Sequence, residues 1–256
     1  MTSTEASSDA GDLLLRPAEP SEADALADLH TAARTAAVPA MPASVHTPEE
    51  TRAWMRGRIG STHEVWVAEL AGALVGYAAL SRNGDRWLDD LYVAPDVTGQ
   101  GIGSALLELA KSLRPDGFAL WVFASNEDAR RFYRRHGLLD LEQTDGSGNE
   151  EHAPDLRMTW PGADPVAYLR GQVDAVDDEL AVLLARRAAL TVAVQRFKPV
   201  PGHAGRDPER EAEIVARMVR RAPGVPADAW RRIVHEVITV SLDLAESTDP
   251  RSSRPS

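Results

Sequence analysis

A glycine-rich turn leads directly into a helical pattern in VAPDVTGQGIGSALL, residues 93–107. Gly99, Gly101 and Gly103 let the backbone turn tightly, and several N–H groups then point outward at the start of the helix. These donors, together with the positive end of the helix dipole, suit a pyrophosphate. The spacing is neither G-x-G-x-x-G nor a P-loop, which argues against a dinucleotide or a nucleoside triphosphate. On this loop alone, a strand–helix turn without a ligand is the alternative.

A second stretch places two cations on the apolar face of a long helical pattern, residues 166–198. At about 100° per residue, Arg187 and Lys198 fall inside the stripe of Leu and Val side chains centred near Leu180. Two buried cations are costly unless an anion pairs with them, and no acid lies near the centre of that face. The pattern predicts an anion site, with snorkelling or an internal salt bridge as the alternative.

The segment KPVPGHAGRDPERE, residues 198–211, follows this helix. It begins with Lys198, one of two lysines in the chain, and it ends in a helix start with Asp207 as N-cap. Arg210 and Glu211 lie in the first turn of that helix, beside the loop that follows Lys198. An ordinary helix start does not explain these two charged residues at that place.

Strand and helix patterns alternate in the first part of the chain. The Ala71-Gly72 pair between two alternating apolar runs predicts a hairpin. The predicted strands cover residues 13–18, 64–70, 73–80, 86–93, 118–124, 138–144 and 155–160. The predicted helices cover residues 22–34, 103–113 and 127–137. This mixture predicts an α/β or α+β domain that ends near Trp160.

The strand signal disappears after the break PGADP, residues 161–165. Three helical patterns follow, over residues 166–198, 207–221 and 226–246. We expect residues 1–12 and 247–256 to be disordered, because both stretches are polar and rich in small residues.

Composition excludes several classes of protein. The chain is 43% apolar without a run long enough to span a membrane, and its first residues lack the pattern of a signal peptide. It has no cysteine, so no disulfide or thiolate metal site can form. The net charge is −11, and neither half carries the basic surplus of a nucleic-acid binder. We expect a cytoplasmic protein with small-molecule substrates, without a metal, nucleic-acid or membrane partner.

The glycine loop and LWVFASNEDARRFYRRHG, residues 120–137, together resemble the GCN5-related N-acetyltransferases (GNAT). The resemblance extends over residues 13–160 and includes the closing DGSGNEEHAPDLRMTW. It implies an α+β GNAT domain, with a mixed central sheet and flanking helices, that transfers acetyl from acetyl-CoA to an amine.

By this resemblance, backbone amides of the loop hold the pyrophosphate of acetyl-CoA. Val93 would pair its backbone with the pantetheine arm, and Asn126 would contact the arm as well. Thr98 replaces the Arg or Gln that many members have, but binding should survive because the donors are mostly backbone groups. The loop residues concerned are Gly99, Gln100, Gly101, Ile102, Gly103 and Ser104.

The resemblance also assigns proton transfers. Tyr133 would act as general acid and protonate the departing CoA thiolate. Asp89 and Asp90 lie on the strand before the loop, and adjacent strand residues point to opposite faces, so only one can reach the acceptor amine. We favour Asp90 as the base, with a solvated acid as the alternative. The loop 149–151 could meet a cationic acceptor or be solvated.

A second resemblance covers residues 164–246. YLRGQVDAVDDELAVLLARR, FK, RDPERE and VITVSLDL resemble the all-helical (AroQ-type) chorismate mutases, which rearrange chorismate to prephenate in aromatic amino acid biosynthesis without a cofactor. The resemblance implies an all-α three-helix domain in an intertwined homodimer, where each site receives Arg170 from the partner. Along one helix Arg170 lies about 26 Å from Arg187, so one ligand cannot touch both in the same chain.

The family's roles follow for the substrate contacts. Arg170 and Arg187 would bind the two carboxylates, and Lys198 would donate to the ether oxygen of the breaking bond. Catalysis would be conformational restriction with electrostatic stabilisation. Asp207, Arg210 and Glu211 would line the ring-hydroxyl side, and Glu211 would accept from the hydroxyl. Ser241 would lie near a carboxylate.

One departure affects the mutase assignment. The family usually has Gln or Glu four residues after the serine, as a second donor to the ether oxygen, and this chain has Ala245. Losing such a donor costs on the order of 10²–10³ in rate. Alternatives are action on isochorismate or 4-amino-4-deoxychorismate, or a non-catalytic dimerisation or ligand-sensing module. The expected organisation is a GNAT domain at 13–160, a linker at 161–165 and a chorismate mutase domain at 166–246.

Overall fold

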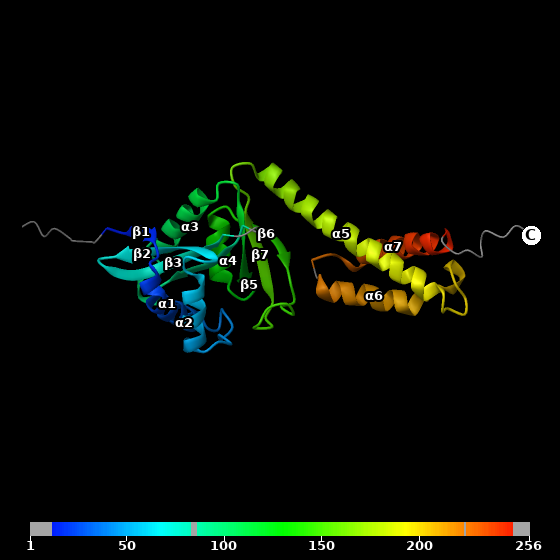
Figure 1. The fold of residues 1–256 in the computed structure, drawn as a ribbon, viewed down its shortest axis with the longest axis horizontal. Coiled ribbons are helices and arrows are strands. Elements are labelled where there is room, and N and C mark those ends of the chain that lie inside the picture. The colour runs from blue at the N-terminus through cyan, green and yellow to red at the C-terminus, as the bar shows by residue number, and fades with distance from the viewer. Residues whose placement is uncertain (1–11, 83–85, 223, 248–256) are drawn as a thin grey trace, which may run out of the picture. The chain divides into compact units, whose positions relative to one another are not determined.

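The computed structural model describes residues 12–82, 86–222 and 224–247. The chain divides into two compact units, with the main boundary in the sequence between Pro165 and Val166; residues 143–145 are grouped with the second unit (Figure 1). The prediction of disorder for residues 1–12 and 247–256 falls almost entirely outside the described residues.

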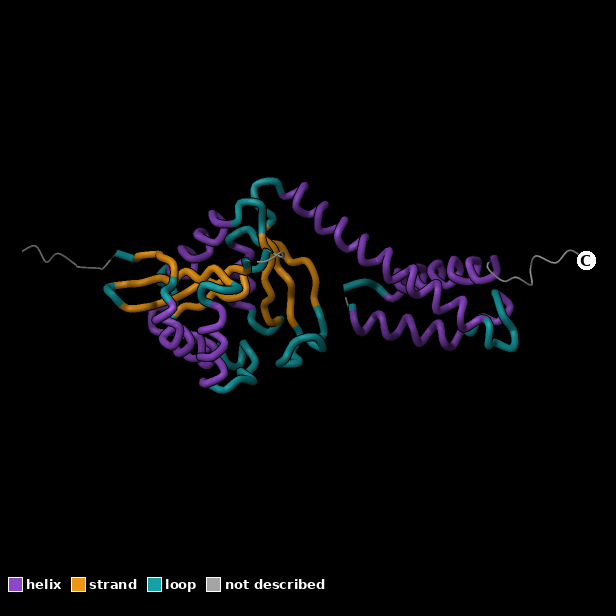
Figure 2. The backbone as a smooth tube through the Cα atoms, in the orientation of Figure 1, coloured by secondary structure: helices purple, strands orange, loops and turns teal. Residues whose placement is uncertain are grey.

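The first unit contains two small sheets (Figure 2). One sheet is antiparallel throughout, in the order β1-β2-β3-β4, and the other has the order β5-β7-β6. Ala71 and Gly72 both have positive φ, as the type I′ turn of a two-residue hairpin requires. The predicted hairpin is confirmed. The strands are β1 Leu14–Pro17, β2 His63–Leu70, β3 Ala73–Ser81, β4 Leu88–Val93, β5 Phe118–Phe123, β6 Leu139–Gln143 and β7 Asp155–Trp160.

The two sheets meet where β4 and β5 begin. A parallel bridge joins Trp87 to Ala119, and the N–H of Ala119 donates to the carbonyl of Arg86 at 2.8 Å. Within the described residues, β4 and β5 have no further backbone pairing. The edge of β4 that faces β5 is therefore left unpaired over most of its length.

Four helices cover the sheets of this unit: α1 Ala23–Ala36, α2 Pro48–Arg58, α3 Ile102–Leu113 and α4 Glu127–Arg135. Helices α1 and α2 bury Leu26 and Met55 against Tyr77 of β3, whereas α3 buries Leu106 with Phe118 in a second cluster. Gly76 allows α3 to lie close to the sheet, because a Cβ there would be 3.2 Å from Leu106 and 3.3 Å from Ile102 of α3.

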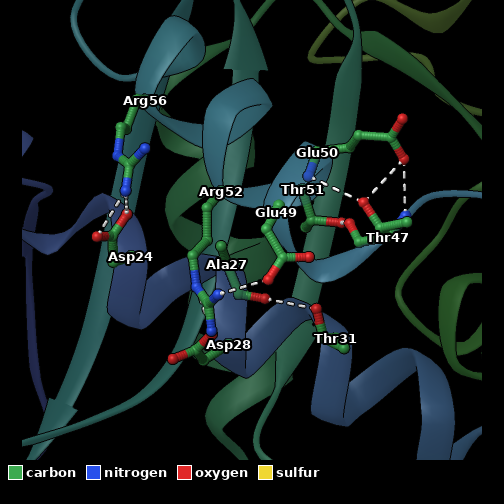
Figure 3. Close-up of polar contacts among 10 residues, drawn as sticks. All are labelled: Asp24, Ala27, Asp28, Thr31, Thr47, Glu49, Glu50, Thr51, Arg52 and Arg56. Atoms are coloured by element: carbon green, nitrogen blue, oxygen red, sulfur yellow. Dashed lines mark hydrogen bonds and ion pairs between the residues drawn. The ribbon is translucent and has the colours of Figure 1, made fainter.

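Helix α2 was not among the predicted helices. Thr47 and Glu50 form a reciprocal capping box at its start, with the N–H of Glu50 donating to Thr47 at 3.3 Å and that of Thr47 donating to Glu50 at 2.8 Å. Ion pairs from Arg52 to Asp28 and from Arg56 to Asp24 join α2 to α1 (Figure 3). The capping box is a signal that the sequence does contain.

The second unit is all-helical, as predicted. It consists of α5 Pro165–Gln195, α6 Pro208–Arg221 and α7 Ala227–Ser247, with a short 3-10 helix, η3 His203–Gly205. Val215 of α6 is buried, as are Val234 and Leu242 of α7. Helix α5 has no buried residue, and Leu180, for example, is 47% exposed. None of the helices in the described residues is long and apolar enough to cross a membrane.

Candidate active sites

The glycine loop ends in a helix start that no side chain caps. Gly99 and Gly101 have φ of 86° and 87°, a region that glycine adopts readily, and Gly101 is the N-cap of α3. No side chain caps α3 and its first turn has no acid, whereas α2, α4 and α6 are capped by Thr47, Asn126 and Asp207. The first N–H groups of α3 therefore lack the usual side-chain acceptor, and they can donate to an anion.

The backbone of Val93 faces the unpaired edge of β4. Val93 is opposite Gly76, and the N–H of the following Ala94 donates to Val75 at 2.9 Å. Polar backbone groups alternate between the two sides of an antiparallel strand. The N–H and carbonyl of Val93 therefore point away from β3, toward the side of β5, and can pair with an extended ligand.

Two residues of α4 were predicted to act at this site. Tyr133 is 9% exposed, and its pKa is raised by burial and by the charge of Asp90, which keeps the hydroxyl protonated as a general acid requires. The Oδ1 of Asn126 accepts from the N–H of Ala129 at 3.2 Å and caps α4. Asn126 thus has a structural role, and its contact with pantetheine stays a prediction.

The argument that only one of Asp89 and Asp90 can reach the acceptor side was wrong. The β3–β4 register shifts between Ala79 and Leu80, so that Asp89 is an extra residue in β4. Such a bulge breaks the alternation of side chains. Both carboxylates therefore reach the same guanidinium, that of Arg58, at 3.5 Å from Asp89 and 3.4 Å from Asp90.

Asp90 has the properties of a base that works near neutral pH. It is 6% exposed, and burial raises its pKa to about 6 against the opposing charge of Arg58. Its Oδ2 has no hydrogen-bond partner among the described residues. Asp89 is more exposed and accepts a hydrogen bond from His63 at 2.9 Å when His63 carries the proton on Nε2. The preference for Asp90 as the base therefore stays a prediction, with these contacts in its favour.

The burial of Asp90 predicts a pH-dependent gain in stability for Asp90→Asn. The pKa in the folded protein lies above the ordinary value of 3.8, so ionised Asp90 opposes folding above about pH 6 and this cost fades as pH falls. We expect the free energy of unfolding of Asp90→Asn relative to wild type to rise by about 2 kcal/mol between pH 4 and pH 7. Urea unfolding across that range measures it, and a constant difference would contradict the assignment.

The loop between β6 and β7 is held by ion pairs. Glu151 pairs with Arg34 of α1 at 2.7 Å, both side chains being largely buried, and Glu150 contacts His46 at 2.5 Å. Asn149 donates to the carbonyl of Ala153 at 2.8 Å. Glu151 is thus buried in an ion pair, whereas the side chain of Glu150 is 69% exposed, so the expectation of a solvated loop fits Glu150 but not Glu151. A contact of this loop with a cationic acceptor stays a prediction.

Sequence reasoning missed a buried histidine beside this site. The Nδ1 of His30 lies 2.7 Å from the hydroxyl of Tyr77, and the ring lies 4.5 Å from that of Tyr92. Burial lowers the pKa of His30 to about 4, so it is neutral at physiological pH. A histidine on a predicted amphipathic helix carries no signal of this contact.

In the second unit, neutral oxygens hold the two predicted cations. Arg187 donates to the hydroxyl of Ser241 at 2.9 Å and to the carbonyl of Val237 at 3.2 Å. Lys198 donates to the carbonyl of Gly205 at 2.6 Å. Neither cation forms an ion pair within the described residues, and burial lowers the pKa of Arg187. Two cations without a counterion are what an anion site requires.

Glu211 is paired with an arginine that the sequence analysis did not single out. Arg206 donates to both carboxylate oxygens of Glu211 at 2.8 Å, and to Thr239 of α7 at 3.1 Å. Asp207 accepts from the N–H of Arg210 at 3.0 Å, which confirms its role as N-cap. The guanidinium of Arg210 lies in an exposed ion pair with Glu213, so its role toward a substrate stays a prediction.

The structure does not bring Arg170 to this cluster. It is exposed on α5, in the same continuous helix as Arg187. At the other end of the unit Ala245 is buried, and Glu246 accepts from the N–H of His203 at 3.2 Å. Glu246 therefore interacts with η3. It does not replace the side-chain donor that family members usually have at the position of Ala245.

Two family models match this chain. The acetyltransferase (GNAT) domain matches residues 61–137, and chorismate mutase type II matches residues 169–246. The chain contains a GNAT acetyltransferase domain and a type II chorismate mutase domain. The match to the GNAT domain includes the uncapped start of α3, and the match to the mutase domain includes Arg187 and Lys198.

Relatives of the GNAT domain span only part of the chain. The peptidyl-lysine N-acetyltransferase YiaC of Escherichia coli is 32% identical over 98 residues, covering 38% of this chain and 62% of YiaC. An uncharacterized N-acetyltransferase of Archaeoglobus fulgidus is 35% identical over 101 residues, covering 34% of this chain and 66% of that protein. The chain thus spans under two thirds of either relative. The apo form of YjaB from Escherichia coli, a solved structure, is 25% identical with a TM-score of 0.48, covering 59% of this chain and 99% of YjaB.

Proposed function

We propose that this chain is a bifunctional enzyme. The GNAT domain transfers acetyl from acetyl-CoA to an amine, and the chorismate mutase domain rearranges chorismate to prephenate. The observation that carries the proposal is the presence of both domains in one chain.

Acetyl-CoA fits the unpaired groups beside β4. The N–H groups from Gly99 to Ser104 would hold the pyrophosphate, because the start of α3 has no side-chain cap. Val93 would pair with the pantetheine arm through the backbone groups that point away from β3. Together these contacts would place the thioester near the end of β4, within the unit that also holds Tyr133 and Asp90.

Acetyl transfer then needs three proton movements. Asp90 takes a proton from the acceptor ammonium, and the free amine attacks the thioester carbonyl. As the carbon–sulfur bond breaks, Tyr133 donates its proton to the thiolate, so that CoA leaves as a thiol. The new amide nitrogen gives up its extra proton, which restores the hydroxyl of Tyr133, and Asp90 releases its proton to solvent. Thiol release from acetyl-CoA across a panel of primary amines, including a lysine peptide, tests this half of the proposal. Failure of the full chain to bind acetyl-CoA would overturn it.

The mutase reaction needs no nucleophile and no cofactor. Arg187 and the partner's Arg170 would bind the two carboxylates of chorismate, Ser241 would lie near one of them, and Lys198 would donate to the ether oxygen as charge builds there. Glu211 would accept from the ring hydroxyl. In the structure it is paired with Arg206, so this pair would have to share or release an oxygen when substrate binds.

A homodimer through the mutase domain is part of this proposal. The stripe of apolar side chains on α5 is largely exposed in the single chain, for example 37% for Leu184 and 60% for Leu183, and a partner helix would cover it. If sites are shared, Arg170→Ala and Lys198→Ala are each inactive, yet an equal mixture of refolded chains regains about a quarter of wild-type turnover, from the one intact site of each heterodimer. Light scattering checks the mass; a monomer, or no recovery on mixing, would contradict the shared site.

The buried Ala245 favours a second candidate for the C-terminal domain. With no amide or carboxylate at that position, the cations can bind a dicarboxylate without full stabilisation of the transition state. The domain would then sense chorismate or a related ligand, or act on isochorismate or 4-amino-4-deoxychorismate. Calorimetry with chorismate alongside the turnover assay separates binding from catalysis.

A further inference from the structure

One guanidinium serves two carboxylates at the acceptor side of the GNAT domain. Arg58 is the last residue of α2, its side chain is 11% exposed, and it lies 4.2 Å above the ring of Trp54. Its two terminal nitrogens lie 3.4 Å from Asp90 and 3.5 Å from Asp89. The bulge in β4 produces this arrangement, because it lets consecutive aspartates reach the same cation.

The contacts are electrostatic and leave hydrogen-bonding capacity unused. Both distances exceed that of a good charge-assisted hydrogen bond. The Oδ2 of Asp90 and the Nε and Nη2 of Arg58 are buried without a hydrogen-bond partner among the described residues. Buried polar atoms without partners are unfavourable, so their presence here is consistent with a group that arrives with the substrate. This Oδ2 of Asp90 is also the oxygen that lies 3.4 Å from Nη1 of Arg58, so an amine N–H would share it with the guanidinium.

Charged and titratable groups from several elements surround Asp90, and they act in opposite directions. Arg58 is the strongest of those that favour the ionised form, and Asp89 disfavours it. His63 of β2 reaches the site through Asp89. The groups that interact electrostatically with Asp90 are Arg58 of α2, Arg34 of α1, Asp89 and Tyr92 of β4, Tyr77 of β3 and Tyr133 of α4.

We propose that Arg58 is a positioning residue for acetyl transfer, which keeps Asp90 ionised while its Oδ2 can still accept from the acceptor amine, and that Asp89 opposes it. The inference rests on the proposed acetyltransferase function. It predicts that the group accepting the acetyl carries an N–H donor. This group would approach Asp90 between α2 and β4. The role of Arg58 also explains why a base can be buried at this position without losing its charge near neutral pH.

The direct test is the titration of Asp90 in the full chain, followed by ¹³C NMR of aspartate carboxyl carbons and assigned with Asp90→Asn. Arg58→Gln is expected to raise the pKa of Asp90 by about one unit or more, since it removes an opposite charge within 4 Å. Asp89→Asn is expected to lower it, and Arg58→Lys to leave it near the wild-type value. Arg56→Gln is the matched control on the same helix, because Arg56 pairs with Asp24 in an exposed ion pair (Figure 3).

The rate profile must follow the titration. The acidic limb of kcat/KM for acetyl transfer is expected to move to higher pH in Arg58→Gln and to lower pH in Asp89→Asn, with unchanged affinity for acetyl-CoA. Loss of a residue that only supports the fold would not shift the acidic limb in these opposite directions in the two variants. If Arg58→Gln does not fold, Asp89→Asn alone decides by the sign of its shift.

An unchanged pKa of Asp90 in Arg58→Gln, or shifts of the same sign in both variants, would overturn the inference even if the wild-type protein transfers acetyl. Absence of thiol release by the wild-type protein counts against the proposed function, and the NMR titration detects the electrostatic coupling independently of it.

Discussion

Lys198→Ala is expected to lower kcat for chorismate rearrangement by about 10³-fold. Lys198 is the expected donor to the ether oxygen, and with Ala245 at the position of the second donor no other side chain is assigned to share that role. The charge that develops on the ether oxygen would then have no assigned partner. The assay is the loss of chorismate absorbance with the purified variant.

The folding of this variant has to be checked separately. The ammonium of Lys198 donates to the carbonyl of Gly205, so we expect a small loss of stability and unchanged helix content by circular dichroism. Arg217→Ala, at an exposed position on α6, is the matched control and should keep wild-type turnover. Turnover by Lys198→Ala within a factor of about ten of wild type would remove Lys198 from the proposed mechanism.

Tyr133→Phe is expected to lower kcat for acetyl transfer by about 10²–10⁴-fold. The change removes one hydroxyl from a buried ring and leaves the volume almost unchanged, so packing in the core of the GNAT domain should persist. Affinity for acetyl-CoA should also persist, because the proposed pyrophosphate contacts would come from the loop 99–104.

Thiol release and calorimetry with acetyl-CoA separate these two effects. A fall in kcat with constant affinity supports a proton donor. Unchanged kcat would show that water or another group protonates the thiolate. Weaker binding with unchanged kcat would assign Tyr133 to cosubstrate binding instead.

Local chemistry explains which features the sequence could predict. A glycine before a helix, an Asp followed by Pro, and alternating apolar residues each specify backbone structure within a few positions. The starts of α3 and α6 and the β2–β3 hairpin were predictable for this reason. Helix α2 was overlooked despite its capping box, because PEETRAWMRGR is mostly polar and shows little of the apolar stripe that marks the other helices.

Features that depend on long-range pairing were not predictable. The bulge at Asp89 arises from the register between β3 and β4, which no local pattern encodes, and so the two aspartates were assigned to opposite faces. Arg58 follows from α2 and from that bulge together. The Arg206–Glu211 pair is close in sequence, but the contact of Arg206 with Thr239 depends on how α6 packs against α7.

The stripe argument identified Arg187 and Lys198, but the predicted helix over 166–198 was too long: α5 ends at Gln195, so Lys198 lies beyond the helix and helical spacing does not place it on the stripe. Arg187 does lie on α5, where the stripe is exposed in the single chain, so a cation there is not costly until a partner covers the helix. What distinguishes them is that both are held by neutral oxygens without a carboxylate. A charged ligand can therefore bind without first breaking an ion pair.

The central claim is that one chain combines two catalytic domains. Because of Ala245, the mutase activity is the part that most needs a direct test. The most direct measurement follows chorismate and prephenate over time with the purified full-length protein. Conversion to prephenate that disappears in Arg187→Ala is the expected result. Tight binding of chorismate without any conversion would contradict the claim and leave the C-terminal domain as a ligand-sensing dimerisation module.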